Sequence, residues 1–189
     1  MRVIAGRAKG RRLYGPVDGT RPITDRAKES LFSILSTRLG NARFLDLFAG
    51  TGAVGIEALS RGAEHATFIE NSKKAVKTIY RNLTHTQLGE NAEVIFADVA
   101  KFLVGRATPF DMIFVAPPQY KELWSKTLQL IDDSPQWLTP QGVTIVQIDP
   151  TEERQLTLSN LVLHDTRRYS NVMLCFYKRT VSQDGTQSM

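Results

Sequence analysis

Short apolar runs alternate with amphipathic segments along most of this chain. From residue 44 onward, runs of four to six mostly apolar residues recur, and segments with apolar residues at helical spacing separate them. This alternation predicts parallel strands joined by helices. The expected strands are 44–47, 66–69, 93–96, 111–115 and 143–148, and the expected intervening helices are 53–60, 73–84, 99–104 and 120–131.

The two ends of the chain depart from this alternation. Two strands expected at 161–168 and 171–177 are too close for a connecting helix, so they should pair antiparallel. The predicted fold is therefore α/β, a doubly wound, mostly parallel, seven-stranded Rossmann-like sheet with an antiparallel C-terminal hairpin. Segments 2–5 and 11–14 predict a small basic β-hairpin, and Thr24 predicts the N-cap of a helix that Gly40 ends.

We expect an N-terminal arm at 1–22, a main domain at 23–180 and a polar, disordered tail at 181–189. The chain of 189 residues has a net charge of +5, and residues 1–30 hold eight basic and three acidic residues, which accounts for the whole excess. A polyanionic partner at this end and a solvated charged terminus both fit that charge. Lys73, Lys74, Lys77 and Arg81 lie at helical spacing, where a solvated face is favoured over an RNA surface.

Other chemistry is sparse. The single cysteine, Cys175, excludes an internal disulfide, and no apolar run reaches the length of about 18 residues that a membrane span needs. The N-terminus lacks the apolar core of a signal peptide, so a cytoplasmic protein without a membrane partner is expected. His65, His85 and His164 are scattered without ligand spacing, which argues against a metal site.

The segment 46–55 has the pattern of a strand end, a glycine turn and a helix start. Gly50 and Gly52 permit a tight turn and the close approach of a ligand, and the helix directs its N-terminal amides toward that turn. This predicts a site for an adenosine-bearing cofactor. The spacing to Gly55 also matches the dinucleotide fingerprint. A nicotinamide enzyme is disfavoured, because its first glycine usually follows the strand directly and no second half for a nicotinamide follows here.

Three acidic residues, Asp46, Glu70 and Asp98, lie at or near the ends of expected strands. Glu70 follows Asp46 by 24 residues, which is one strand–helix–strand unit, and an acid there can accept both ribose hydroxyls of an adenosine. Each acid could instead cap a helix or end a turn. The capping alternative is less convincing when all three acids and the glycine turn are considered together.

Two consecutive prolines, Pro117 and Pro118, follow the expected strand 111–115. They should hold the backbone extended and rigid at the edge of the sheet and place Tyr120 beside the glycine turn. The ring of Tyr120 could stack on a base. The alternative is a structural turn in which Tyr120 serves as packing.

Three segments together resemble a known family. Asp46-Leu-Phe-Ala-Gly-Thr-Gly resembles the first motif of S-adenosylmethionine-dependent methyltransferases, and Ala116-Pro-Pro-Gln-Tyr resembles the Asp/Asn-Pro-Pro-aromatic motif of those that methylate exocyclic amino groups. More narrowly, the segment 21–29 and the basic start resemble the RsmD-type bacterial 16S ribosomal RNA guanine-N2 methyltransferases. The resemblance runs from Arg2 to about Arg179.

The resemblance implies transfer of a methyl group from S-adenosylmethionine to guanine N2 in small-subunit ribosomal RNA or an assembling 30S subunit, by a monomer. It implies that the cofactor is held by residues around the glycine turn and the next two strand ends, namely Asp46, Phe48, Gly50, Gly52, Glu70, Asn71, Asp98 and Val99. It places the target guanine at Ala116, Pro117, Pro118, Gln119 and Tyr120, and the RNA phosphates at Arg2, Arg7, Arg11, Arg12, Arg21 and Arg26.

The chain departs from the family pattern at Ala116, where Asp is usual, and at Gln119, which moves the aromatic residue one position later. A guanine amino group is a poor nucleophile, and an acceptor for its hydrogens aids attack. Backbone carbonyls with in-line positioning of the methyl group could suffice. The amide oxygen of Gln119 could replace the carboxylate, or the chain could bind RNA and cofactor without turnover. A DNA amino-methyltransferase is a further alternative, for which the chain offers little room to read sequence.

Overall fold

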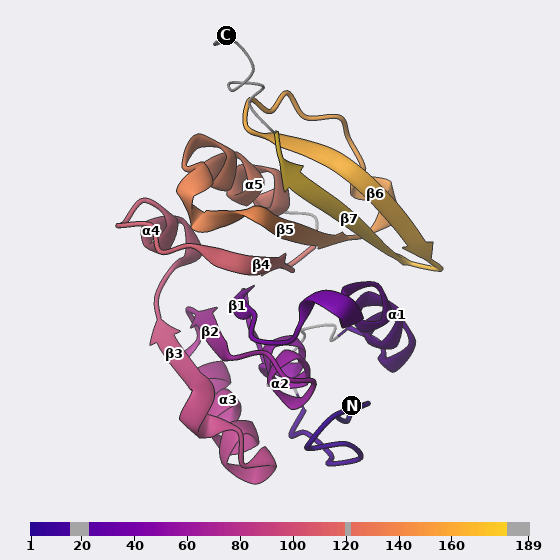
Figure 1. The fold of residues 1–189 in the computed structure, drawn as a ribbon, viewed down its shortest axis with the longest axis vertical. Coiled ribbons are helices and arrows are strands. Elements are labelled where there is room, and N and C mark those ends of the chain that lie inside the picture. Colours follow the sequence, from indigo (N-terminus) through magenta and orange to yellow (C-terminus); the bar gives the residue numbers. More distant parts are fainter. Residues whose placement is uncertain (16–22, 120–121, 181–189) are drawn as a thin grey trace, which may run out of the picture.

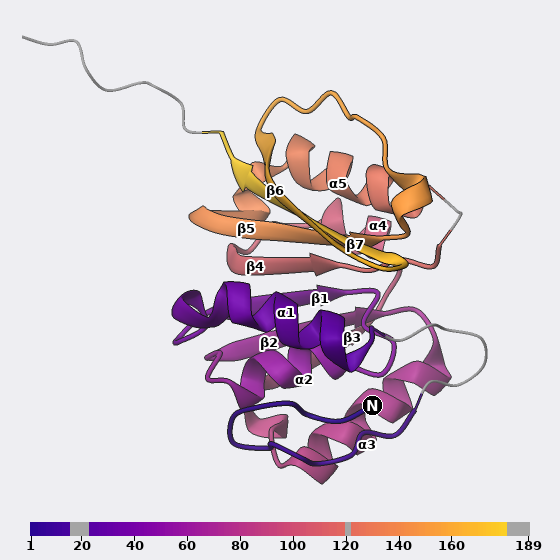
Figure 2. The ribbon, with the colours of Figure 1, turned by 90° about the vertical axis from the view of Figure 1, so that its right-hand side faces the viewer.

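A computed structural model describes residues 1–15, 23–119 and 122–180 of the chain. Our expectations for Arg21, Tyr120 and the tail at 181–189 lie outside these described residues. The described part forms a single seven-stranded sheet with helices on both faces (Figures 1 and 2). None of its helices is long and apolar enough to cross a membrane.

The sheet has the order β3-β2-β1-β4-β5-β7-β6. The parallel strands β1 to β5 are followed by an antiparallel pair, in which β7 lies between β5 and β6. This confirms the predicted fold class. The strands are β1 (Arg43–Leu47), β2 (His65–Glu70), β3 (Ala92–Phe96), β4 (Phe110–Val115), β5 (Leu138–Ile148), β6 (Leu161–Tyr169) and β7 (Val172–Arg179).

Helices cover the sheet in two groups (Figure 2). Three pack on one face, namely α1 (Asp25–Leu35), α2 (Ala53–Ser60) and α3 (Lys73–Thr86), and two pack on the other, α4 (Val99–Leu103) and α5 (Leu123–Asp133). Short 3-10 turns follow at η1 (Ser36–Arg38), η2 (Gly89–Asn91), η3 (Pro135–Trp137) and η4 (Pro150–Glu152). Apolar side chains on each side of the sheet form a separate core.

Local sequence explains most helix ends. The hydroxyl of Thr24 accepts a hydrogen bond from the amide of Ala27 at 3.2 Å, so Thr24 is the predicted N-cap. The helix ends at Leu35 and continues as η1, earlier than Gly40. The helix expected at 120–131 was placed too early: α5 begins at Leu123, because Glu122 has a left-handed backbone (φ 53°). Strand β5 begins five residues earlier than the expected start at 143.

Residues 1–15, called the N-terminal arm from here on, pack against the main domain. The two limbs of the arm pair through a single antiparallel bridge, Arg2 to Arg12, which is shorter than the expected hairpin strands. Val3, Ala8 and Leu13 of the arm are buried in the same core as α1 and α2. The apolar residues that alternate with the arginines therefore anchor the arm to the domain.

Candidate functional site

The carboxyl end of β1 leads into a turn with unusual backbone conformations. Phe48, Gly50 and Gly52 all have left-handed backbones, with φ values of 62°, 56° and 75°. Such a conformation costs little for glycine and more for phenylalanine. Gly52 is the N-cap of α2, so the first amides of α2 face the turn. A Cβ built on Gly50 would meet only the carbonyl of Phe48 at 4.0 Å, so the turn leaves room for a ligand beside the backbone.

Gly55 fulfils a different requirement. A Cβ at this position would lie 2.3 Å from the ring of Phe68 on β2. A side chain there would push α2 away from the sheet. The third glycine of the motif thus sets the close packing of helix on strand, and the first two shape the turn.

Asp46 and Glu70 hold this turn from two adjacent strands. Asp46 Oδ2 accepts the amide of Gly55 at 2.9 Å, and Glu70 Oε2 accepts the amide of Gly50 at 2.8 Å. Glu70 Oε1 also accepts the amide of Ser72 at 2.8 Å. Burial raises the pKa of Asp46 to about 8, and the charge of Glu70 adds to this rise, while the hydrogen bond from Gly55 opposes it.

The carboxyl ends of β2 and β3 carry the other expected cofactor residues. Asn71 is exposed directly after Glu70, and Val99 is buried at the start of α4. Asp98 is exposed and caps α4, since its Oδ1 accepts the amide of Lys101 at 3.0 Å. Both the capping interpretation and the binding interpretation of Asp98 are compatible with this position. These residues share one sheet edge with the glycine turn because β1, β2 and β3 run parallel.

The proline pair follows β4 at the same edge. β4 lies next to β1, with Val115 opposite Leu47, and the amide of Ala116 faces the Leu47 carbonyl at 3.5 Å. Ala116, Pro117 and Gln119 are partly buried, and Pro118 is exposed. The structure therefore brings the proline motif next to the strand that carries the glycine turn.

One candidate residue was missed from the sequence. Val146 of β5 lies opposite Val115, so Gln147 is the neighbour of Ala116 across the two strands. Residues two apart on a strand point to the same face, so Gln147 faces the same side of the sheet as Ile145. Ile145 packs in the core that Ala116 also contacts, so Gln147 and Ala116 both face the α1 side. Its buried Oε1 has no hydrogen-bond partner among the described residues. Only the presence of a glutamine in a mostly apolar strand could have signalled it.

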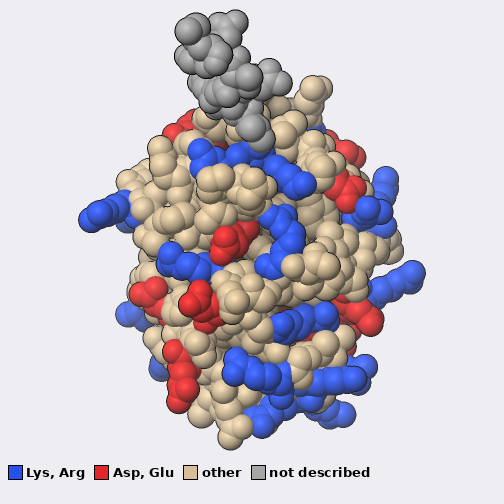
Figure 3. Space-filling view, in the orientation of Figure 1, with Lys and Arg blue, Asp and Glu red and all other residues tan. Residues whose placement is uncertain are grey.

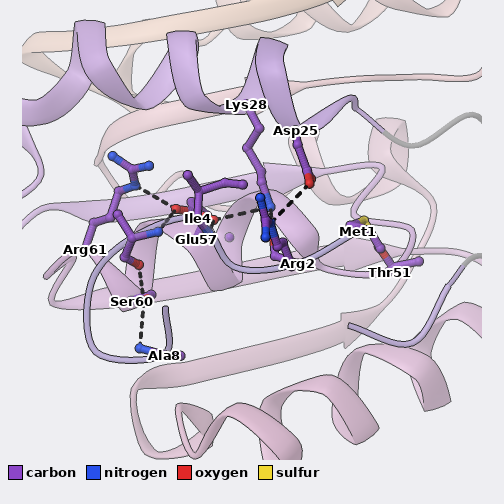
Figure 4. A network of polar contacts seen from close by, with 12 residues as sticks. Met1, Arg2, Ile4, Ala8, Asp25, Lys28, Thr51, Glu57, Ser60 and Arg61 are labelled. Atoms are coloured by element: carbon purple, nitrogen blue, oxygen red, sulfur yellow. Dashed lines mark hydrogen bonds and ion pairs between the residues drawn. The ribbon is translucent and has the colours of Figure 1, made fainter. Parts of the chain in front are cut away.

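A buried ionic network fixes the N-terminal arm to α2 (Figure 4). The carboxylate of Glu57 accepts the amides of Ile4 at 2.8 Å and Ala5 at 3.0 Å, and it lies 3.2 Å from the ammonium of Lys28 and 2.7 Å from Arg61 Nε. The side chains of Lys28 and Glu57 are both fully buried. Lys28 thus belongs to the interior, although its charge contributed to the basic N-terminal segment of the sequence.

A second buried residue joins the arm to the glycine turn. Asn82 of α3 accepts the amide of Tyr14 at 2.7 Å and donates to the carbonyls of Tyr14 at 3.3 Å and Thr51 at 2.9 Å. Thr51 lies between Gly50 and Gly52. The arm and the turn are therefore held by the same side chain.

The expected RNA-binding arginines other than Arg21 are spread over the arm and the start of α1. Arg2 lies 3.7 Å from Asp25, and Arg11 donates to Gln87 at 3.0 Å and to the carbonyl of His85. Arg7, Arg12 and Arg26 are exposed. In Figure 3, Lys and Arg side chains gather at the end of the molecule where the arm lies.

The strand order, the glycine turn after β1 and the acids on β1 and β2 define a Rossmann-like methyltransferase. A family model described as "Conserved hypothetical protein 95" matches residues 1–178, and the chain belongs to this family. The family predicted from the sequence is thereby confirmed.

Relatives match along nearly the whole chain. "Putative rRNA methyltransferase YlbH" of Bacillus subtilis is 39% identical over 95% of this chain and 99% of its own length. "Ribosomal RNA small subunit methyltransferase D" of Escherichia coli is 35% identical over 95% of this chain and 90% of its own. Among solved structures, "Putative methyltransferase yhhF from Escherichia coli" has a TM-score of 0.84 at 35% identity and covers 95% of this chain and 97% of its own.

Proposed function

We propose that this protein transfers a methyl group from S-adenosylmethionine to the exocyclic N2 of a guanine in small-subunit ribosomal RNA. The observation that carries the proposal is the geometry at one sheet edge. The glycine turn, held by Asp46 and Glu70, lies beside the strand β4, which leads into Ala116 and the proline pair. The names of the relatives support the substrate class.

The residues at the turn fit the proposed cofactor. The left-handed backbone at Gly50 and the room beside it suit a ligand that lies against the main chain. Asp46 would hold the methionine end, and Glu70 would accept the ribose hydroxyls with the lone pairs that its two backbone amides leave over. Asn71, Asp98 and Val99 would surround the adenine. When bound, S-adenosylmethionine supplies a methyl group on a sulfonium, which is the electrophile of the reaction.

The target guanine would lie against the proline motif. Because Ala116 has no side-chain acceptor, another group must accept the hydrogens of the amino group. The amide oxygens of Gln119 and Gln147 are the two side-chain candidates, and Gln147 Oε1 is the one that is buried and without a partner among the described residues. The rigid prolines would hold the base so that its nitrogen faces the methyl group in line.

The arm would bind the RNA backbone. Exposed arginines suit phosphate contacts, which give affinity and orientation and no base specificity. We further propose that the protein acts as a monomer in the cytoplasm, on free RNA or on the assembling 30S subunit.

The test is methyl transfer itself. The full chain is incubated with methyl-labelled S-adenosylmethionine and small-subunit particles from a strain that lacks this methylation, and label in a guanine of the RNA is expected. Absence of label in the RNA would contradict the proposal. An unmethylated large-subunit particle serves as the control substrate.

Ala116 favours a second candidate function, the binding of RNA and cofactor without turnover. Ala116→Asp and Gln119→Ala distinguish the two. If the natural chain is inactive, Gln119→Ala changes nothing and Ala116→Asp creates activity, the chain is a binding protein.

A further inference from the structure

The outer face of α3 has the composition of a nucleic-acid contact. The helix contains no Asp or Glu, and Lys73, Lys77, Tyr80 and Arg81 recur at positions that share one side of a helix. All four are exposed. We call these four residues the α3 face. At a rise of about 1.5 Å per residue, the stripe extends for about 12 Å along the helix.

Aromatic rings are interleaved with these cations. Tyr80 is 53% exposed, and Phe96 at the end of β3 is 54% exposed. The ammonium of Lys73 lies 5.8 Å from the centre of the Phe96 ring, and the guanidinium of Arg81 lies 3.4 Å from the centre of the Tyr14 ring. Cations that follow a phosphate backbone, together with exposed rings on which bases stack, are what proteins use to bind unpaired nucleic acid.

The α3 face is continuous with the cofactor turn at one end and with the N-terminal arm at the other. At one end, Ser72 caps α3 and donates its amide to Glu70, so the stripe starts at the rim of the cofactor turn. At the other end, Arg11 of the arm binds Gln87 directly after α3, and Asn82 holds both backbone groups of Tyr14. The arm and α3 therefore present one joined surface.

We propose that the α3 face, together with Phe96, binds an unpaired stretch of the substrate RNA next to the target nucleotide. The inference rests on the proposed function. It adds the path of the RNA along the protein and the unpaired state of the RNA on that path. It also replaces our interpretation of the α3 lysines as a solvated face. An acidic protein would satisfy the cations alone, whereas unpaired bases satisfy both the cations and the exposed rings.

The experiment measures the affinity of the full chain for two fluorescent RNAs, one unstructured and one a perfect duplex, over a series of salt concentrations. Lys73→Glu/Lys77→Glu should weaken binding of the unstructured RNA about tenfold or more and lower the salt slope by about two. Tyr80→Ala/Phe96→Ala should weaken the unstructured RNA about tenfold and leave the duplex nearly unchanged.

Two further variants make the outcomes distinct. Lys126→Glu/Arg106→Glu places the same charge change on exposed residues away from α3 and should leave RNA affinity within about twofold of wild type. Arg12→Glu tests the arm. If Arg12→Glu weakens binding and both α3 variants bind like wild type, the inference is wrong and the proposed function stands. If the wild-type chain binds neither RNA, the inference is wrong, and the methyl-transfer assay on small-subunit particles decides the proposed function separately.

Discussion

Replacement of Glu57 by leucine should detach the N-terminal arm and strongly destabilise the protein. Leucine has a similar volume, so the change mainly removes the carboxylate. It leaves the ammonium of Lys28 buried without its counter-ion, and it leaves the amides of Ile4 and Ala5 without their acceptor. Removal of one partner of a buried pair costs about 3–5 kcal/mol. For a chain of this size, such a loss lowers the Tm by about 6–20 °C.

The destabilisation should depend on pH with a definite sign. Burial lowers the pKa of Lys28, and the charge of Glu57 opposes this effect. Without Glu57 the folded-state pKa falls further below its value in the unfolded chain, so stability rises with pH across that interval. The deficit of Glu57→Leu should therefore shrink as the pH rises and Lys28 loses its proton in the folded state.

Urea denaturation at several pH values measures the free energy of unfolding, and hydrogen exchange at the amides of Ile4 and Ala5 reports the arm. Glu64→Leu, at an exposed position just beyond α2, is the matched control and should change stability by less than about 0.5 kcal/mol. Lys28→Met/Glu57→Leu should be more stable than the sum of the two single changes predicts, because it leaves no unpaired charge. A loss below about 1 kcal/mol for Glu57→Leu, or simple additivity, would refute the reasoning.

Three other changes test the site. Gly6→Ala should release the arm, since its Cβ would lie 1.8 Å from the Ser60 carbonyl oxygen; RNA affinity should fall, the urea midpoint should fall as well because Val3, Ala8 and Leu13 leave the core, and unchanged affinity would contradict this. Asp46, with its pKa raised to about 8, should make the free energy of unfolding fall as the pH rises from about 4 to about 8, and Asp46→Asn should flatten that part of the profile. Gln147→Leu should stabilise the protein by up to about 1–3 kcal/mol, because Oε1 lacks a partner among the described residues, while it lowers methyl transfer; full activity would exclude Gln147 as the acceptor.

Periodicity in the sequence was sufficient to predict the fold, because parallel strands buried on both faces leave continuous apolar runs. The N-cap at Thr24 was also predictable, because its capping hydrogen bond involves only the next three residues. The sequence predicted an antiparallel C-terminal hairpin, and the structure supplied the order of the strands, with β7 between β5 and β6. The start of α5 was not predictable, because no residue type near Glu122 demands the left-handed backbone that delays the helix.

The geometry of the glycine turn was predictable because it is set within its own segment. Gly50 and Gly52 lie in one turn, and Asp46 near the end of β1 accepts the amide of Gly55 just beyond that turn. Lys28 and Gln147 were not predictable, because the environment of each is set by a distant element. Lys28 meets Glu57, which lies 29 residues later, and Gln147 meets the end of β4 only through strand pairing.

Asn82 has a consequence for the construction of chimeras from members of this family. Because its one amide group serves the backbone of Tyr14 and the carbonyl of Thr51, the arm is not an independent module. An arm exchanged between two proteins would have to carry the same backbone geometry at this position, or the segment between the two glycines would lose a support in the interior. The arm can be transplanted only together with the helices that hold it, α1, α2 and α3.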